Sequence, residues 1–266
     1  MENLTEKNKI EIKPMGSYLE TDDEGFVVNP ASPEKFQEEW KPVIDDMVEG
    51  YKKYFGEHLT QVYVRGSVAK GQAVPDVSDI DTFAYVDLPK EEINNSGRKE
   101  FKDEMAKRYP FVEGFEFGVS PVSTFEKNQI ILNQSVCVYG DPVDVKKLKP
   151  GKEMMLHAFA LGGDWTRNLK DFSEKETNNE KNKTWSVWFF KAMLRSGFEI
   201  TMERSGLYTR DLYKCYEGFS KYYPEKESEM REILNLTLNP TADKEKLLEA
   251  ANSILPWLTE ESKKYI

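Results

Sequence analysis

The sequence of 266 residues has few of the side chains that build zinc and redox centres. Its two cysteines, Cys137 and Cys215, have no CxxC partner and are too few for a disulfide framework, so we expect reduced, buried thiols. Its two histidines, His58 and His157, leave little material for a histidine-based zinc site or a Ser-His-Asp triad. If the chain is an enzyme, carboxylate chemistry is the main possibility left.

Long apolar runs are missing as well. No window approaches the roughly 20 apolar residues of a membrane-spanning helix. The N-terminal stretch MENLTEKNKIEIKP has neither the apolar core nor the cleavage site of a signal peptide. We therefore expect a cytoplasmic protein with no membrane partner.

Positive charge is in short supply, since 37 Lys and Arg face 47 Asp and Glu, for a formal net charge of -10. This balance disfavours a long nucleic acid as partner, because such binding relies on clustered Lys and Arg. The negative charge is compatible with a cationic small molecule or a metal-neutralised nucleotide as ligand. The alternative interpretation is that it only keeps the protein soluble. With 39% hydrophobic and 12% aromatic residues, the chain is nevertheless rich enough in packing groups to be globular.

The first half of the chain alternates between helical and strand patterns, which is typical of an α/β layer. Apolar residues at helical spacing from Phe36 to Tyr51 follow the helix-start signal Ser32-Pro33-Glu34. Runs rich in Val, Ile, Phe and Tyr predict strands over residues 61–65, 80–86, 111–119 and 136–139, and a charged helix is expected over about 90–107.

A polar stretch with proline and glycine, from Gly140 to Lys152, predicts a boundary between two domains, residues 1–150 and 151–266. Beyond it the pattern is helical, with stripes formed by Met154, Ala158, Leu161, Trp165 and Leu169, by Trp185, Phe189, Ala192 and Met193, and by Leu212, Cys215, Tyr216, Phe219 and Tyr222. Connections are expected at residues 178–182 and 239–241. The second domain is thus predicted to be a bundle of about four or five helices.

A glycine turn directly follows the first predicted strand, in the run Val64-Arg65-Gly66-Ser67-Val68-Ala69-Lys70-Gly71. Backbone amides around Gly66 and Ser67 can face a phosphate there with no Cβ in the way. The run is not a P-loop, because Gln72-Ala73 follows Gly71 where a lysine and a hydroxyl residue are needed. On its own, the turn indicates little more than a change of chain direction.

Two carboxylates one residue apart follow in Ser78-Asp79-Ile80-Asp81-Thr82-Phe83. Residues two apart in a strand share a face, so Asp79 and Asp81 are expected to project together. Two anions held so close repel unless a cation lies between them. Because apolar residues continue the strand, the pair sits at the mouth of a buried element, where Mg²⁺ bridged to phosphate oxygens is the expected occupant.

Together the two runs, Arg65-Gly66-Ser67-x-Ala69-x-Gly71 and Ser78-Asp79-Ile80-Asp81, resemble the signature of DNA polymerase β-like nucleotidyltransferases, particularly the small bacterial antibiotic nucleotidyltransferases. The segment from Ile131 to Asp141 is similar to the one closing their catalytic domain. The resemblance implies an α+β fold, with an α/β catalytic domain containing a mixed sheet followed by a helical bundle. It also implies two Mg²⁺ ions, with ATP or another NTP as co-substrate.

The family uses a third acidic residue on a neighbouring strand. Alternation in the segment Phe115-Glu116-Phe117 leaves Glu116 on the face opposite the two phenylalanines, and it is our candidate metal ligand or general base. Glu113 is the alternative, and a third interpretation makes Glu116 a solvent-facing strand residue.

Candidate nucleotide-binding residues fall in two places. Gly66 and Ser67 would hold the β- and γ-phosphates, with Lys70 as an added charge or a solvated loop residue. In the second domain, Trp188, Lys191, Arg195 and Glu199 share one helical stripe that would place Lys191 or Arg195 near a phosphate. The alternative is an exposed face with the cations solvated and Trp188 in the core. Residues 164–167 and 209–211, the latter with Thr209 as a possible helix cap, are left undecided.

The expected function is Mg²⁺-dependent transfer of a nucleoside monophosphate, AMP from ATP, to a hydroxyl of a small acceptor with release of pyrophosphate. An aminoglycoside-like polycation is the acceptor suggested by the family, in a monomer or homodimer. Transfer to a protein or RNA acceptor, as in toxins with a similar motif, is a second hypothesis. A catalytically silent, antitoxin-like nucleotide-binding protein is a third.

Overall fold

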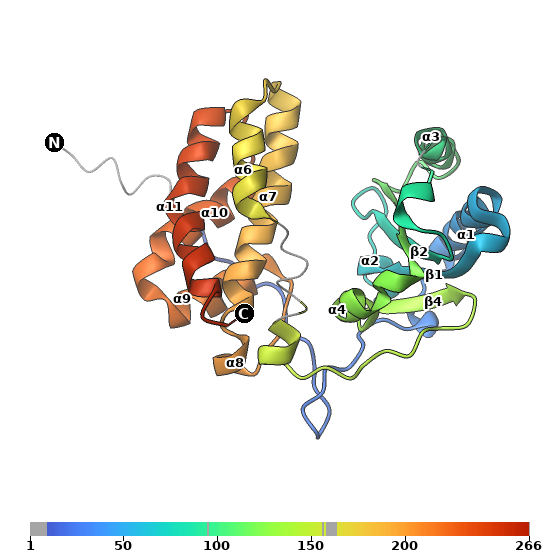
Figure 1. Cartoon of the computed structure of the whole chain (residues 1–266), viewed down its shortest axis with the longest axis horizontal. Coiled ribbons are helices and arrows are strands. Elements are labelled where there is room, and N and C mark those ends of the chain that lie inside the picture. The colour runs from blue at the N-terminus through green and yellow to red at the C-terminus, as the bar shows by residue number, and fades with distance from the viewer. Residues whose placement is uncertain (1–9, 95, 156, 158–163, 266) are drawn as a thin grey trace. The chain divides into compact units, whose positions relative to one another are not determined.

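The computed structural model describes residues 10–94, 96–155, 157 and 164–265. Its chain forms two compact units, Phe26–Leu148 and Met1–Gly25 together with Lys149–Ile266 (Figure 1). Grouping of residues 10–25 with the helical unit is not indicated by any sequence pattern. The domain division at residues 1–150 and 151–266 stays a prediction.

A mixed four-stranded sheet in the order β3-β2-β1-β4 forms the centre of the unit Phe26–Leu148. The strands are β1 (Leu59–Arg65), β2 (Ile80–Val86), β3 (Phe115–Pro121) and β4 (Ser135–Tyr139). β1 is antiparallel to both β2 and β4, whereas β2 and β3 are parallel. The expected α+β class with a mixed sheet is confirmed.

The third strand begins at Phe115, four residues later than the sequence predicts. Residues 111–114 instead bond to the loop before β2: Asp76 donates its backbone N–H to the Phe111 carbonyl, and Glu113 donates to the Ser78 carbonyl. This segment therefore fixes the start of β2, which carries Asp81 and directly follows Asp79.

Helices α1 (Lys41–Phe55) and α3 (Arg98–Arg108) pack on one face of the sheet, and α4 (Gln129–Leu132) lies toward the other (Figure 1). Both long predicted helices are shorter than expected. Separate 3₁₀ turns at Pro33–Lys35 and Glu38–Trp40 precede α1, and one at Lys90–Glu92 precedes α3. Gly97, in the left-handed region with φ of 77°, marks the start of α3.

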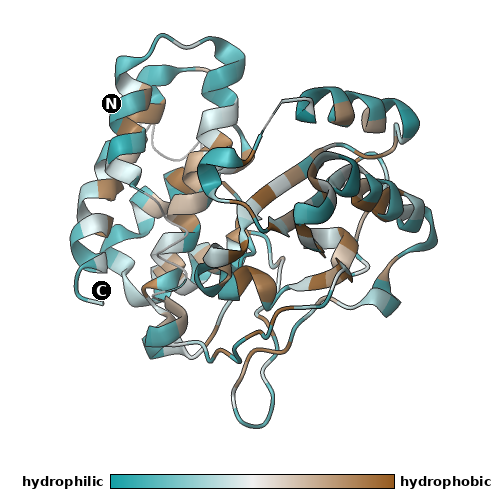
Figure 2. Cartoon of the chain, turned by 45° about the vertical axis from the view of Figure 1, so that its right-hand side comes forward, coloured by the Kyte–Doolittle hydropathy of each residue, from teal (hydrophilic) through white to brown (hydrophobic). Residues whose placement is uncertain are grey.

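Alternation along β2 separates the two faces of the sheet. Ile80, Ala84 and Val86 are fully buried toward α1, while Phe83 and Tyr85 join Tyr63 in a second cluster on the opposite face. In Figure 2 the strands are largely hydrophobic in colour and the outer turns of the helices largely hydrophilic. Asp81 belongs to the second face, so its carboxylate is kept out of the main core.

Besides a short helical stretch at residues 152–155 and a 3₁₀ turn at Pro224–Lys226, the described part of the second unit contains six α-helices around a central α7 (Figure 1). They are α6 (Trp165–Glu174), α7 (Asn179–Glu199), α8 (Met202–Ser205), α9 (Leu212–Tyr222), α10 (Glu227–Leu238) and α11 (Lys244–Ser262). α7 packs against α9, α10 and α11, with Phe189, Phe190 and Phe198 fully buried. The expected bundle is confirmed, with five long helices and the short α8.

Two details of the predicted bundle differ or cannot be compared. The expected connection at residues 178–182 is mostly helix, because the Asn178 side chain accepts a hydrogen bond from the Lys181 N–H and caps α7. In the first predicted stripe, Ala158 and Leu161 lie outside the described residues.

Both cysteines are free, with Cys215 buried as expected and Cys137 only partly buried. Within the described ranges, no helix has the length and apolar character to cross a membrane.

Tyr51 ties α1 to the two strands that carry the acidic residues. Its hydroxyl lies 3.0 Å from Thr82 Oγ1 and donates to the Gly118 carbonyl at 3.1 Å, and its ring stacks on Phe117 at 3.8 Å. We predict that Tyr51→Phe keeps the stacking but lowers the free energy of unfolding by about 1–2 kcal/mol, since it leaves buried acceptors unsatisfied. Denaturant titration measures this, and unchanged stability would contradict it.

Candidate functional site

Pairing of the strands brings three charged residues into one row on the second face of the sheet. Arg65, the last residue of β1, pairs with Asp81 on β2, and Asp81 pairs with Glu116 on β3. Directly opposed residues on neighbouring strands have side chains within contact distance of each other. The row therefore places two acids and one base at the end of β1.

The Arg65 guanidinium binds both acids in this row. Its Nη2 donates to Glu116 Oε2 at 2.5 Å and lies 3.4 Å from Asp81 Oδ1. Side-chain exposure is 29% for Arg65, 21% for Asp81 and 46% for Glu116, so the group lies in a shallow site open to solvent. Sequence reasoning did not assign Arg65 a role, because its partners depend on strand order.

Glu116 has an electrostatic environment that favours its ionised form. Burial acts to raise the pKa of Glu116, but its contacts with Asp81 and with the charge of Arg65 outweigh burial, so its pKa lies below the ordinary value. Asp79 acts in the opposite direction, by repulsion. Glu116 is thus a carboxylate at neutral pH, near both aspartates.

Glu113, the alternative third acid, lies before β3 in the turn bonded to Ser78. It has no place in the row of paired residues, whereas Glu116 stands directly beside Asp81. Geometry therefore favours Glu116 over Glu113. Glu116 does face solvent, as the third interpretation expects, but it is also bound by Arg65.

Gly66 makes the close approach between the turn and the acids possible. Its φ is +75°, and a Cβ added at this position would lie 2.4 Å from Asp81 Oδ2. Only glycine combines this backbone conformation with that contact. The glycine thus leaves a cradle beside the Asp81 carboxylate that any other side chain would fill.

The rest of the turn is a single helical turn, α2 (Gly66–Ala69), followed by Lys70. The Ser67 carbonyl accepts hydrogen bonds from the N–H groups of Lys70 and Gln72, which holds the loop closed. Asp79 is exposed just before β2, with its Cβ about 3.6 Å from a Cβ built on Gly114. Gly66, Ser67, Asp79 and Asp81 are therefore gathered around the ends of β1 and β2.

The donor chemistry of this site fits Mg²⁺. Three carboxylates supply the hard oxygen ligands that Mg²⁺ prefers, and the cradle beside Asp81 leaves room at one of them. Among the side chains that the structure describes, no three His, Cys, Asp or Glu are already arranged to hold a metal ion. The residues are thus suitable in kind, while their carboxylates are not gathered around one point.

The stripe of Trp188, Lys191, Arg195 and Glu199 on α7 does not match the alternative interpretation, in which the cations are solvated and Trp188 is buried. Trp188 is 50% exposed, whereas Glu199 is only 4% exposed and Lys191 is partly buried. Arg195 donates from Nε to the Arg210 carbonyl at 3.3 Å, so it is not a solvated surface cation. The alternative interpretation, an exposed helix face with solvated cations and Trp188 in the core, is therefore wrong.

Arg195, Glu199 and Arg210 form a charged cluster inside the helical unit. Burial lowers the pKa of Arg195 to about 10, and Arg210 acts in the same direction. Burial also raises the pKa of Glu199 to about 7, although both arginines oppose it. Two guanidinium groups and one carboxyl leave this cluster net positive whether or not Glu199 is ionised.

Two stretches left undecided from sequence have structural roles. Asp164 caps α6, its side chain accepting from the Arg167 N–H at 2.9 Å. Thr209 is not the cap of α9; its hydroxyl donates to the Ser17 carbonyl and accepts from the Asp211 N–H. The N-terminal segment thereby fixes the loop that carries Arg210.

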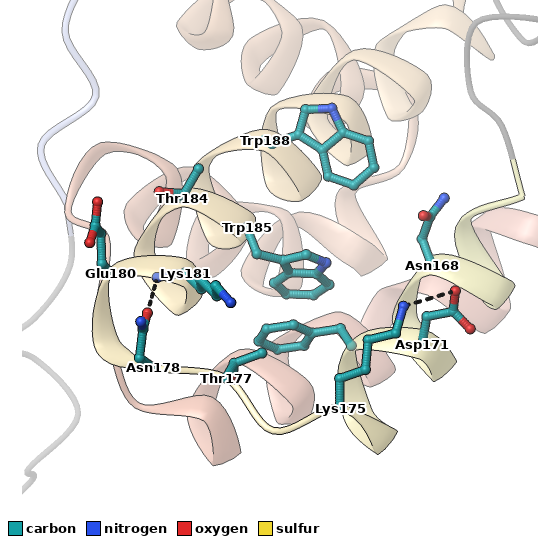
Figure 3. A pocket seen from close by; sticks show the side chains of 11 residues that line it. Asn168, Asp171, Lys175, Thr177, Asn178, Glu180, Lys181, Thr184, Trp185 and Trp188 are labelled. Atoms are coloured by element: carbon teal, nitrogen blue, oxygen red, sulfur yellow. Dashed lines mark hydrogen bonds and ion pairs between the residues drawn. The ribbon is translucent and has the colours of Figure 1, made fainter. Parts of the chain in front are cut away.

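A cavity of about 540 Å³ lies between α6 and α7 (Figure 3). Trp185 stacks on Phe172 with ring centroids 3.7 Å apart, and Trp188 adds an exposed indole. Carboxylate, ammonium, amide and hydroxyl groups surround these rings, from Asn168, Asp171, Lys175, Thr177, Asn178, Glu180, Lys181 and Thr184. The mixture of aromatic faces and hydrogen-bonding groups is suited to a polar small molecule. Trp185 belongs to one of the apolar stripes predicted from the sequence, but that pattern did not predict a cavity.

A family model for the nucleotidyltransferase domain matches residues 44–208, which include the whole sheet and its row of charged residues. The chain belongs to the nucleotidyltransferase domain family. The suspected family is therefore confirmed, and the protein is a nucleotidyltransferase.

Other comparisons add little to this assignment. No curated protein matches the sequence. Among solved structures, spectinomycin adenyltransferase AAD(9) from Enterococcus faecialis, crystallised with ATP and spectinomycin, is similar with a TM-score of 0.45 and 12% sequence identity, over 83% of this chain and 98% of that chain.

We predict that Gly66→Ala displaces the Asp81 carboxylate and costs about 1–3 kcal/mol of stability, through the clash and the left-handed backbone together. Gly56→Ala is the matched control, since Gly56 also has positive φ, +50°, but no atom lies within 4 Å of a Cβ added there. Denaturant titrations and transfer assays on both variants measure the difference. Equal losses in the two would contradict a specific contact with Asp81.

Proposed function

We propose that this nucleotidyltransferase moves AMP from ATP onto a hydroxyl group of a small-molecule acceptor and releases pyrophosphate. The observation that carries the proposal is the row Arg65-Asp81-Glu116 beside the Gly66 turn, inside the segment matched by the family model. ATP is chosen because the motif resembles that of the antibiotic nucleotidyltransferases. A cytoplasmic location is part of the same proposal.

Asp79, Asp81 and Glu116 are the proposed Mg²⁺ ligands, and Glu116 is also the proposed proton acceptor. When bound, Mg²⁺ neutralises charge on the triphosphate and on the leaving pyrophosphate. The ionised Glu116 accepts the proton of the acceptor hydroxyl, whose oxygen then forms the bond to the α-phosphorus. The bond between the α-phosphorus and the bridging oxygen breaks, and its electrons leave with pyrophosphate.

Phosphate binding is assigned to the turn after β1, through the amides of Gly66 and Ser67 and the charge of Lys70. Lys191 and Arg195 remain proposed nucleotide ligands. We add Arg210, because both Arg210 and Arg195 interact electrostatically with Glu199. The net positive charge of the cluster around Glu199 supports an anionic ligand.

The acceptor is assigned to the cavity between α6 and α7. Exposed aromatic faces beside carboxylate and amide groups suit a polyhydroxylated ring, since the rings contact C–H faces while Asp and Asn bind hydroxyls. An aminoglycoside-like compound is the proposed acceptor on the strength of the motif; in the cavity itself Lys175 and Lys181 balance Asp171 and Glu180, and Lys175 Nζ lies 3.6 Å from Asp171 Oδ2. The overall charge of -10 would assist capture of such a cation.

We predict that Asp79→Asn and Asp81→Asn each lower transfer by at least about a thousandfold while the proteins stay folded, because each removes a proposed metal ligand and no core contact. The assay uses labelled ATP, Mg²⁺ and a panel of aminoglycosides, lincosamides, protein and RNA. Label on a macromolecule would instead favour the toxin-like alternative. Nucleotide binding without pyrophosphate release by the wild type would favour a silent protein.

Trp188 offers a test of the acceptor cavity. We predict that Trp188→Ala raises KM for the acceptor about tenfold with little change in kcat or in KM for ATP, because it removes an exposed contact face. Leu238→Ala, which removes another exposed apolar side chain of the helical unit, is the control. A change in KM for ATP alone would assign the cavity to the nucleotide.

A further inference from the structure

One cation serves two carboxylates in the row of charged residues. We propose that Arg65 is a resident counter-ion for Asp81 and Glu116 that competes with the divalent cation for the same carboxylate oxygens. This inference rests on the proposed metal role of the acids. It gives Arg65 a positioning role that neither the motif nor the family assignment supplies.

Strand register gives the two acids a reason to share a counter-ion. Asp81 and Glu116 are direct partners on parallel strands, so their carboxylates are held side by side by the backbone and cannot separate fully. Like charges at directly opposed positions destabilise a sheet. Arg65, paired to Asp81 from the other side, is the side chain that register places within reach of both.

The contacts show how the guanidinium fills this role. Its Nη2 lies 2.5 Å from Glu116 Oε2 and 3.4 Å from Asp81 Oδ1, so one nitrogen serves both acids. An Mg²⁺ ion bound by the same two oxygens would need them at about 2.0–2.1 Å. Nitrogen and metal therefore cannot occupy the space between these oxygens together, and binding of the ion requires the guanidinium to withdraw.

Withdrawal is feasible because Arg65 is not locked in a core. Its side chain is 29% exposed and has several rotatable bonds, and the residue after it is Gly66, which has no side chain to block movement. In the metal-free protein, Arg65 reduces the repulsion between Asp81 and Glu116. Because this ion pair must break before a metal ion binds, it also lowers the affinity for the metal. Loss of Arg65 should thus weaken the metal-free fold but strengthen metal affinity.

The test measures Mn²⁺ binding to the whole chain without nucleotide, by the electron paramagnetic resonance signal of free Mn²⁺. We expect Arg65→Met to bind Mn²⁺ about three- to tenfold more tightly than wild type, as expected when a competing ion pair of modest strength is removed. Arg65→Lys, which keeps the charge without the planar fork, should lie between them. Tm of each metal-free variant checks that it is folded.

Arg108→Met is the matched control, because Arg108 also joins two acids, Asp46 at 2.6 Å and Glu104 at 3.5 Å, away from the row. It should leave Mn²⁺ affinity unchanged. Equal or weaker binding by Arg65→Met, or no binding by it at all, would overturn the inference.

Asp81→Asn separates this inference from the proposed function. If Asp81→Asn weakens Mn²⁺ binding while Arg65→Met leaves it unchanged, the acids still hold the metal and only the competition is wrong. If Asp81→Asn binds Mn²⁺ as tightly as the wild type does, the metal role of the acids fails, and the inference fails with it.

Discussion

Register between β1, β2 and β3 is the constraint on which the site depends. It places Arg65, Asp81 and Glu116 side by side from three segments that are far apart in the sequence. A slip of one residue in either pairing would turn an acid toward α1 and into the core. The core contacts of Ile80, Ala84 and Val86 on the other face oppose such a slip, so hydrophobic packing sets the position of the charged row.

Much of the catalytic half could be predicted because its signals are local. Strand composition located three of the four strands to within two residues, and alternation placed Asp81 on the face of β2 opposite Ile80. Asp79 lies just before β2, so its position on the same face as Asp81 stays a prediction. The start of β3 was placed too early, since residues 111–114 are apolar enough for a strand but bond to the loop before β2. Arg65 was missed because its partners follow from strand order, which no local pattern encodes.

The helical half shows the limit of periodicity. Stripes predicted which helices form, and α9 follows its stripe closely. The stripe with Phe189 and Met193 is buried, but periodicity did not predict the burial of Glu199, which shares a stripe with the half-exposed Trp188. Burial there depends on α9 and α10 packing around α7, and on the N-terminal segment reaching Thr209, which are contacts between distant parts of the chain.

The central claim is that the acids beside the Gly66 turn hold the metal that binds the triphosphate. A crystal structure of the protein with a non-hydrolysable ATP analogue and Mg²⁺ tests it most directly. The account predicts Mg²⁺ bound to Asp79 and Asp81, with the triphosphate against the amides of Gly66 and Ser67. A triphosphate bound elsewhere, or an Mg²⁺ ion without a carboxylate from these strands, would contradict it.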